Sequence, residues 1–342
     1  MSDQGGGSAA PVDITVIGAG PTGLFAAFYA GLRDAKVRII DALPELGGQL
    51  TALYPEKYIY DVAGFPKVLA KDLVKYQAEQ ALQFDPAVHL DERVEALEPC
   101  DSGRGYTVVT GKGRYRTGAV LIAAGLGAFQ PRILKAPGVA EHEGRGVRYA
   151  PRPLDSYAGQ NVVIVGGGDS AVDWVLALKD RARSVTLVHR RDGFRAHQAS
   201  LKLMMEAVNA GQVRLLTFHE VKAVTGNDSA EEIVVYDNRV KDGGREEVIK
   251  VDEVLFMLGY IANLGPIADW RLDLEKGTIK VDTTMATNLP GVYAAGDIVT
   301  YPGKLKLIAT GYGEAAIAAN HAFVYAHPEA KVSPGHSSET QR

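Results

Sequence analysis

Residues 12–41 read VDITVIGAGPTGLFAAFYAGLRDAKVRIID. A short β-branched run over residues 13–17 ends in glycines, and residues 21–31 place apolar side chains at helical spacing. A second β-branched run follows over residues 36–40. Strand, helix and strand in this order predict one βαβ unit, the building block of a parallel sheet.

The turn after the first strand has the glycine spacing Gly18-Ala-Gly20-Pro-Thr-Gly23. The first glycine allows a tight turn, the second lets the backbone approach a pyrophosphate, and the third lets the helix pack against the strand. The helix N-terminus then offers free N–H groups and a partial positive charge to the phosphates. Asp41 ends the second strand, where a carboxylate can bind a ribose diol. An ordinary glycine-rich turn would explain the glycines alone, but not the flanking strand, helix and acid together.

Residues 161–188 repeat the order strand, helix, strand, which indicates a second nucleotide-binding domain. The turn reads GGGDSA at 166–171, and the second strand ends in HRR at 189–191 instead of an acid. An acid there would repel a 2′-phosphate, whereas paired guanidinium groups bind it through charge-assisted hydrogen bonds. The second domain is therefore predicted to select NADPH over NADH. A solvated basic turn is the alternative interpretation of the arginines.

The rest of the chain predicts further strands around these two units. Strand-like runs occupy residues 93–97, 106–110, 119–124, 214–218, 233–237 and 251–258. A turn and a buried strand over residues 288–297 precede an alanine-rich helix over residues 311–326. If this strand and helix return to the first domain, the second domain is inserted into it. The predicted class is α/β, with two Rossmann-like domains that each have three layers in the order β, β and α, the second domain being inserted into a discontinuous first one. The predicted boundaries are 11–129 with 264–330 for the first domain, 130–263 for the second, and 331–342 for a tail.

The composition is that of a globular protein without a strong charge bias. Lys plus Arg number 37 and Asp plus Glu 41, a net charge of −4, so neither nucleic acid nor an anionic membrane is an indicated partner. A single cysteine, Cys100, excludes an intramolecular disulfide and a CxxC redox pair. No run reaches the ~18 apolar residues of a membrane helix, and residues 1–10 lack the apolar core of a signal peptide. The eight histidines form no HExxH or i,i+4 pair, so no metal site is expected. The chain is expected in the cytoplasm.

Several segments resemble one family of flavoproteins. Residues 291–297, GVYAAGD, resemble the second flavin motif of proteins with two dinucleotide domains. Residues 189–196, HRRDGFRA, resemble the NADPH loop of bacterial thioredoxin reductases. The Cys-x-x-Cys that those reductases carry before the second unit is absent from residues 147–155. From about Val12 to His336 the chain resembles ferredoxin–NADP⁺ reductases of the thioredoxin-reductase type, most specifically at residues 46–61, 166–174 and 296–306.

This resemblance implies FAD in the first domain, NADPH in the second, and a homodimer. Position by position, it assigns Asp41 to the adenosine ribose, Asp297 to the ribityl chain, and the backbone of Val94 to the adenine. The residues implied at FAD are Gly18, Gly20, Pro21, Thr22, Gly23, Asp41, Gly48, Gln49, Tyr54, Val94, Phe129, Gly296, Asp297, Ser337 and Ser338. Those implied at NADPH are Gly166, Gly168, Asp169, Ser170, Ala171, His189, Arg190, Arg191 and Arg195.

The implied reaction is hydride transfer between NADPH and flavin N5, followed by single-electron transfer to or from an iron–sulfur protein such as ferredoxin, or to flavodoxin. No amino-acid acid or base is required. Tyr54 and His336 would cover the two faces of the flavin ring, and a helix beginning near Gly311 would point its N-terminus at the ring. Lys304 and Lys306 are candidates for docking an acidic ferredoxin, with a solvated loop as the alternative. Two other functions stay open: an NADPH oxidase or diaphorase acting on oxygen or quinone, and a non-catalytic nucleotide-binding redox sensor.

Overall fold

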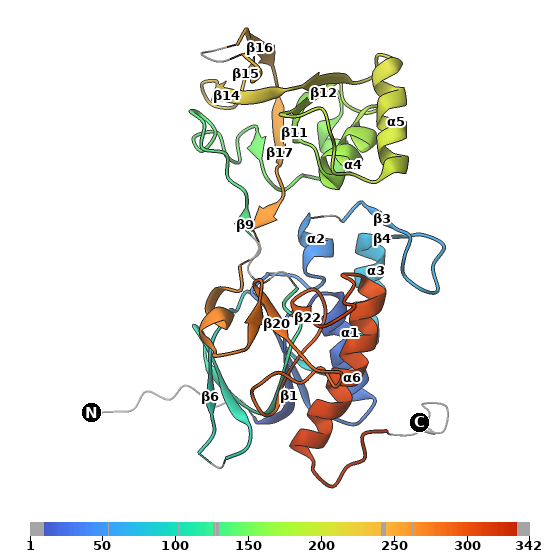
Figure 1. Cartoon of the computed structure of the whole chain (residues 1–342), viewed down its shortest axis with the longest axis vertical. Coiled ribbons are helices and arrows are strands. Elements are labelled where there is room, and N and C mark those ends of the chain that lie inside the picture. The colour runs from blue at the N-terminus through green and yellow to red at the C-terminus, as the bar shows by residue number, and fades with distance from the viewer. Residues whose placement is uncertain are drawn as a thin grey trace, which may run out of the picture. The chain divides into compact units, whose positions relative to one another are not determined.

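The structure, a computed structural model, describes residues 10–53, 55–101, 103–125, 127, 130–240, 244–261 and 263–333. The chain forms two compact units (Figure 1). The second unit is Gln130–Ile261, and the first unit combines the residues before and after it. Each unit has its own sheet, helices and core, so the predicted α/β class with two domains is confirmed.

The first unit is built on one mixed sheet. Its order is β5-β2-β1-β8-β7-β6, and β21 also pairs with β8. Strands β5, β2, β1 and β21 run parallel to one another and to β8, whereas β6, β7 and β8 form an antiparallel meander. The strands are β1 (Val12–Ile17), β2 (Val37–Ile40), β5 (Ala87–His89), β6 (Val94–Pro99), β7 (Tyr106–Thr110), β8 (Arg114–Ile122) and β21 (Val292–Ala294).

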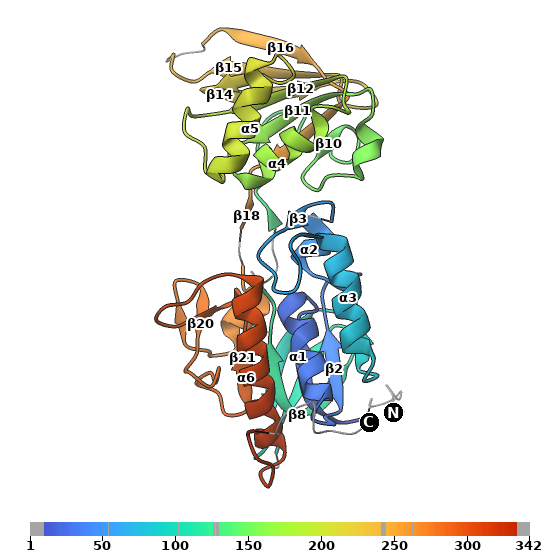
Figure 2. The same ribbon diagram turned by 90° about the vertical axis from the view of Figure 1, so that its right-hand side faces the viewer.

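Alternate residues of these strands enter two different cores. Val16 and Leu121 lie in the core beneath the helices, whereas their neighbours Ile17 and Ile122 lie in the core on the other face. This alternation follows from the two-residue period of a strand, and burial on both faces explains the continuous apolar runs in the sequence. Helix α1 lies between the other two long helices of this unit (Figure 2). The three are α1 (Pro21–Gly31), α3 (Ala70–Leu82) and α6 (Ile308–Ala326).

The opposite face is covered by the meander and by a small sheet of β19 (Leu274–Glu275), β20 (Thr278–Lys280) and β22 (Val299–Thr300). Trp270 joins the two, because its indole donates a hydrogen bond of 3.0 Å to the carbonyl oxygen of Glu95. A short helix and a hairpin lie beside α3, with bounds α2 (Gln49–Leu53), β3 (Tyr58–Ile59) and β4 (Val68–Leu69).

The second unit repeats the layered plan with a parallel sheet. Its order is β10-β17-β11-β12-β13. Helices α4 and α5 cover one face, and the antiparallel sheet β14-β15-β16 packs on the other (Figure 1). The strands are β10 (Val147–Arg148), β11 (Asn161–Gly166), β12 (Ser184–His189), β13 (Arg214–Thr217), β14 (His219–Thr225), β15 (Glu232–Asp237), β16 (Glu246–Lys250) and β17 (Glu253–Met257). The helices are α4 (Asp169–Leu178) and α5 (Gln198–Asn209).

Shorter elements complete the fold. Two-residue strands β9 (Gln130–Pro131) and β18 (Tyr260–Ile261) pair antiparallel where the chain enters and leaves the second unit. Single 3₁₀ turns occur at η1 (Leu154–Tyr157) and η2 (Gly265–Asp269). Within the described residues, no helix is both long enough and apolar enough to cross a membrane.

Candidate functional site: two glycine loops

The first glycine loop leaves β1 at the carboxyl edge of the sheet. Gly18 adopts a left-handed φ of +106°, and a Cβ there would stand 2.5 Å from the carbonyl oxygen of Ala123. A Cβ on Gly23 would stand 1.8 Å from the carbonyl oxygen of Gly18, so the start of α1 packs directly on the turn. By contrast, a Cβ on Gly20 would meet only the Cα of Gly48, at 4.0 Å. Two glycines therefore shape the loop, while Gly20 leaves the space in front of it open.

No side chain caps the first turn of α1, which begins at Pro21. Proline is preorganised for this position, and the uncapped amide groups of the turn are available to an anion. Together with the helix dipole, they form the donor set expected for a pyrophosphate.

Asp41 lies at the end of β2, next to this loop. Its carboxylate accepts hydrogen bonds from the amides of Ala19, at 2.5 Å, and Leu43, at 2.8 Å. Burial raises the pKa of this carboxyl, and the two amide bonds oppose that rise. The backbone N–H of Glu92 donates to the carbonyl oxygen of Asp41, which places the start of β6 at Val94 close by. The predicted ribose and adenine residues therefore lie together.

The segment 47–49 closes the other side of the loop. The amide of Gly47 donates to the carbonyl oxygen of Ala19 over 2.8 Å, and Gly48 faces Gly20. The side-chain nitrogen of Gln49 lies 3.2 Å from where a Cβ on Gly125 would stand. The side-chain amide of Gln49 thus reaches the turn that follows β8.

The segment after β21 reaches the same place from the far end of the chain. Thr22, in the first turn of α1, lies 2.9 Å from a Cβ built on Gly296 and 2.4 Å from one built on Gly311. Asp297 follows and makes no hydrogen bond or close ion pair with another described residue. Burial raises the pKa of its carboxyl, and Lys306 and Lys304 pull it back down. Asp297 is therefore a half-buried acceptor without a donor among the described residues, and a ligand with hydroxyl groups could supply one.

A buried group beside Gly296 contains two residues that the sequence did not indicate, Glu314 and Tyr301, together with Lys304. The buried carboxylate of Glu314 accepts hydrogen bonds from the amide of Gly296, the hydroxyl of Tyr301 and the ammonium of Lys304. Burial and the bond to Glu314 raise the pKa of Tyr301 to about 12. The Lys304 side chain is only 6% exposed, so the prediction that it docks a partner protein is wrong. Lys306 is exposed and stays a candidate.

Helix α6 begins at Ile308, one turn earlier than predicted, because Leu307 is the extended residue before it. No side chain caps its first turn. The helix still presents its N-terminus toward Gly296, since a Cβ on Gly311 would lie 3.7 Å from the Cα of Gly296.

The second glycine loop, in the second unit, leaves β11 and opens α4. A Cβ on Gly166 would lie 2.3 Å from the carbonyl oxygen of Met257, which requires glycine at this turn. The imidazole of His189 lies 2.1 Å from the Cβ position of Gly167, so the ring rests on the loop. Its Nε2 donates to the carbonyl oxygen of Gly193, over 3.0 Å. A Cβ on Gly168 would find its nearest neighbour at 3.8 Å, which leaves that position open to a ligand.

The other predicted residues of this loop lie in the first turn of α4. Asp169 accepts a hydrogen bond of 2.8 Å from the amide of His197, and so fixes the segment before α5. Ser170 is in the same turn, and Ala171 is fully buried against the turn of the loop. Since no side chain caps α4, its amide groups match a second phosphate group.

The three predicted arginines lie next to this loop. Arg195 pairs with Gly168 in a backbone bridge, and Arg190 and Arg191 follow β12 directly. All three are exposed, and none of their guanidinium groups bonds to another residue within the described ranges. The turn itself is held, because the side-chain amide of Asn238 donates to the carbonyl oxygen of Arg190 at 3.0 Å. The positive charge of these arginines therefore faces solvent and makes no contact with another described residue.

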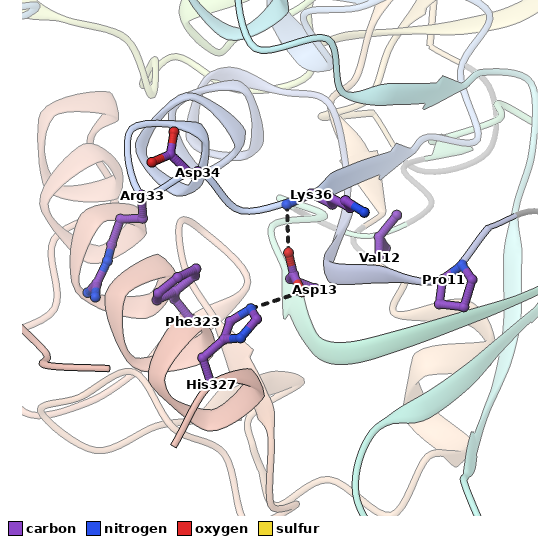
Figure 3. A pocket seen from close by; sticks show the side chains of 8 residues that line it. All are labelled: Pro11, Val12, Asp13, Arg33, Asp34, Lys36, Phe323 and His327. Atoms are coloured by element: carbon purple, nitrogen blue, oxygen red, sulfur yellow. Dashed lines mark hydrogen bonds and ion pairs between the residues drawn. The ribbon is translucent and has the colours of Figure 1, made fainter. Parts of the chain in front are cut away.

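A shallow groove of about 400 Å³ lies at the opposite end of β1 from the glycine loop (Figure 3). His327 donates to Asp13 there, over 2.9 Å. The Arg33 guanidinium lies 4.4 Å from the ring of Phe323 and donates to backbone carbonyl oxygens of Lys331 and Val332, and to the side chain of Asn320. Arg33 thus fixes the chain just beyond α6.

Five predicted cofactor residues lie outside the described part of the chain: Tyr54, Phe129, His336, Ser337 and Ser338. The structure therefore does not address the two proposed ring-covering side chains. Cys100 is described, and it lies in the turn after β6, with its thiol 4.0 Å from the hydroxyl of Thr107.

The chain is similar to known oxidoreductases over almost its whole length. The family model for pyridine nucleotide-disulphide oxidoreductases matches residues 12–322. A ferredoxin–NADP reductase of Thermus thermophilus is 58% identical over 328 residues, which cover 96% of each chain. One of Halalkalibacterium halodurans is 51% identical over 326 residues, 95% of this chain and 97% of the relative.

Among solved structures, a thioredoxin reductase of Lactococcus lactis superposes with a TM-score of 0.77 at 25% identity, covering 92% of this chain and 99% of that one. The resemblance predicted from the motifs is confirmed by these similarities. The chain therefore belongs to the pyridine nucleotide-disulphide oxidoreductase family, in the branch whose members are named ferredoxin–NADP reductase.

Proposed function

We propose that this chain is an FAD-dependent ferredoxin–NADP⁺ oxidoreductase. It passes hydride between NADPH and flavin N5, and single electrons to or from ferredoxin or flavodoxin. The observation that carries the proposal is the difference between the two glycine loops. The first ends beside the half-buried carboxylate of Asp41, and the second beside three exposed arginines whose guanidinium groups bond to no other described residue. One loop suits a ribose diol and the other a 2′-phosphate.

The first unit is proposed to hold FAD, which supplies the hydride and single-electron chemistry when bound. The uncapped turn at Pro21–Gly23 binds the pyrophosphate, and Asp41 binds the adenosine ribose. Asp297 binds the ribityl hydroxyls, and Gln49 contacts the ring system. The open space at Gly20 fits this assignment, because any larger residue would stand where the phosphate has to approach.

The second unit is proposed to hold NADPH. The turn at Gly168–Ala171 binds the pyrophosphate, and Arg190, Arg191 and Arg195 bind the 2′-phosphate. Each charge-assisted hydrogen bond is worth roughly 1.5–3 kcal/mol, so two of them favour NADPH over NADH by about 3–6 kcal/mol at most. Asn238 contributes by fixing the backbone of Arg190.

Electrons reach the acceptor without a protein dithiol. The sequence contains one cysteine, Cys100, and its thiol lies in a turn that follows the meander strand β6. The disulfide step of the thioredoxin reductases that this fold resembles therefore has no counterpart within one chain. The acceptor is proposed to take electrons from the flavin directly, with Lys306 as a contact for an acidic partner.

A homodimer is proposed to complete the flavin site. Tyr58, Tyr60 and Tyr76 are 44%, 69% and 50% exposed on neighbouring elements of the first unit, as expected of side chains that an interface covers. The tail supports the same arrangement. Arg33 holds Val332 next to Asn320, and Asn320 is twelve residues from the start of α6, or about 18 Å along the helix.

His336 lies four residues beyond Val332, and four extended residues span at most ~14 Å. This reach is shorter than the length of α6 from Asn320 to its first residue. The comparison supports a flavin of the partner subunit as the one that His336 covers. Tyr54 is proposed for the other face. The enzyme is proposed to work in the cytoplasm.

The experiment is a comparison of acceptors with the purified protein. It should be yellow, contain FAD, and reduce ferredoxin with NADPH faster than it consumes oxygen. A colourless protein that takes up no FAD would point to a nucleotide sensor instead. Faster oxygen or quinone reduction than ferredoxin reduction would point to an oxidase or diaphorase.

A further inference from the structure

Glu314, Lys304 and Tyr301 form a buried polar group, here called the Glu314 cluster. Glu314 is 3% exposed, and the Lys304 side chain is 6% exposed. One carboxylate oxygen accepts the hydroxyl of Tyr301, at 2.6 Å, and the ammonium of Lys304, at 2.5 Å. The other accepts the amide of Gly296, at 2.7 Å. A single side chain of α6 thus holds two separate parts of the segment that follows β21.

Stability of the fold does not explain this arrangement. Removing two charges from water costs about as much as their attraction returns, and apolar residues of similar size often serve a core equally well. The role of the cluster therefore follows from the part of the backbone that it holds in place. It fixes Gly296, which has a left-handed φ of +86° and packs against Thr22 in the first turn of α1. The next residue is Asp297.

Asp297 receives no hydrogen bond from the described part of the chain. Its carboxylate also feels the cluster electrostatically, since Lys304 lowers its pKa and Glu314 raises it. Lys304 and Glu314 form a pair without net charge, and they act on Asp297 in opposite directions. The cluster can therefore hold the backbone next to Asp297 without imposing a net charge on it.

We propose that Lys304 and Glu314 are positioning residues for Asp297. The ion pair holds the Glu314 carboxylate in place, Glu314 holds the amide of Gly296, and the Asp297 carboxylate is thereby aimed at the ribityl chain of FAD. This inference rests on the proposed function, which places FAD at Asp297. On this inference, Lys304 and Glu314 help to retain FAD without contacting it.

The test measures how fast the holoenzyme releases FAD, followed by the rise in flavin fluorescence. Lys304→Met should release FAD roughly tenfold faster or more, because a hydrogen bond between charged groups is lost. The matched control is Lys306→Met, which removes from an exposed side chain outside the cluster the lysine charge that acts more strongly on Asp297, so that a pure charge effect would be at least as large in this variant. It should change the release rate less than about threefold. Equal rates in Lys304→Met and the unmodified protein, or equal acceleration in both variants, would overturn the proposal.

A double-mutant cycle separates positioning from a general loss of stability. In an Asp297→Asn background, Lys304→Met should add little further acceleration, because the side chain that it positions is already altered. Independent, multiplying effects would contradict the proposal. The double variant Lys304→Met/Glu314→Gln should release FAD more slowly than Lys304→Met alone, since a neutral glutamine still accepts the amide of Gly296 without a buried unpaired charge.

If Lys304→Met does not fold, Tyr301→Phe and the double variant keep the proposal testable. Tyr301→Phe removes one hydrogen bond to the same carboxylate oxygen and should accelerate release a few-fold. Unchanged release in both of these variants would refute the proposal. A protein that never binds FAD in its unmodified form would refute the proposed function instead, so the two failures are distinguishable.

Discussion

The two carboxylates at the proposed FAD site are held in different ways. Asp41 accepts two backbone amides at the end of β2, whereas Asp297 receives no hydrogen bond from the described residues. Burial raises the pKa of both. Two backbone amides therefore stabilise the charge of Asp41, whereas Asp297 would need hydrogen bonds from a ligand. A carboxylate without a donor destabilises the FAD-free protein, and hydrogen bonds from a bound ligand offset this loss.

Replacing Asp297 should separate these two effects. The pKa of Asp297 in the folded state lies above its ordinary value of 3.8. The stability linked to its protonated form is thus present below the unfolded-state pKa and is lost as the pH rises through the folded-state pKa. Asp297→Asn should consequently raise the Tm of the FAD-free protein at pH 7, and the gain should shrink as the pH falls toward 4.

The same variant should bind FAD on the order of ten- to a hundred-fold more weakly, because a charged hydrogen bond is lost. Thermal unfolding across pH and titration with FAD measure the two quantities. A lower Tm at pH 7 together with unchanged FAD affinity would show that Asp297 is an ordinary structural residue.

The arginines after β12 carry the second prediction at this scale. Arg190→Ala/Arg191→Ala should raise the KM for NADPH far more than the KM for NADH, on the order of a hundredfold in relative preference. The reason is that only NADPH has the 2′-phosphate that these side chains would bind. Arg183→Ala, an exposed arginine at the other end of β12, is a suitable control. An unchanged NADPH/NADH preference would remove the assigned role.

At the scale of elements, each glycine in the first loop meets a different constraint. Gly23 packs α1 onto the turn, whereas Gly20 faces open space. The sequence motif predicts both as one set, since it records spacing and not contacts. The structure distinguishes the glycine that the fold needs from the glycine that the ligand needs, and this distinction leads to a matched pair of variants.

Gly23→Ala should damage folding, because its methyl group would stand 1.8 Å from the carbonyl oxygen of Gly18. We expect a loss at or above the upper end of the roughly 1–3 kcal/mol typical of overpacking. Gly20→Ala should leave the FAD-free protein folded and prevent FAD binding, since its methyl group would occupy the space for the pyrophosphate. Circular dichroism melting curves and FAD content after purification measure these outcomes. Normal FAD content in Gly20→Ala would place the pyrophosphate elsewhere.

Local patterns in the sequence predict the two βαβ units well. The first helix is predicted at its observed bounds, and the flanking strands to within one or two residues, because both apolar periods and glycine turns are local signals. Helices α3 and α5 and strand β16 are missed. Strand β16 alternates exposed and half-buried residues on the outer edge of a three-stranded sheet and carries three charged residues in five. Its pairing with β15 is what makes it a strand.

The polar contacts of the site are predicted less completely, for a physical reason. Lys304 and Glu314 are ten residues apart on a loop and a helix, and no periodic pattern links them. In sequence, Lys304 and Lys306 are equivalent surface lysines. Folding buries one beside a carboxylate and exposes the other, which only the path of the chain between β22 and α6 decides. Asn238, which holds Arg190 from another sheet, is hidden from sequence for the same reason.

At the scale of the whole molecule, the two cofactors are assigned to different units. Gln130–Ile261 carries the arginines, and the first unit carries Asp41 and Asp297. The chain crosses between the units twice, next to the paired strands β9 and β18. Hydride transfer requires atoms about 3–3.5 Å apart, so the units have to bring the nicotinamide to the flavin at some stage of the reaction. Whatever covers that face of the flavin must then move aside.

The C-terminal tail is the proposed cover, and its deletion is the last prediction. Removing residues 334–342 takes away His336 but keeps the carbonyl groups of Lys331 and Val332 on Arg33. FAD binding should stay nearly intact, because a stacked ring contributes only about 0.5–1.5 kcal/mol beyond its buried area. The rate of flavin reduction by NADPH should change, and oxygen consumption should rise, since one face of the flavin is uncovered. Stopped-flow flavin bleaching and an oxygen electrode measure the two rates. His336→Ala should show the same changes to a smaller extent, and Arg33→Ala, which frees the start of the tail, should resemble it. If the shortened protein keeps both rates of the full chain, His336 does not cover the flavin and the tail has no part in the site.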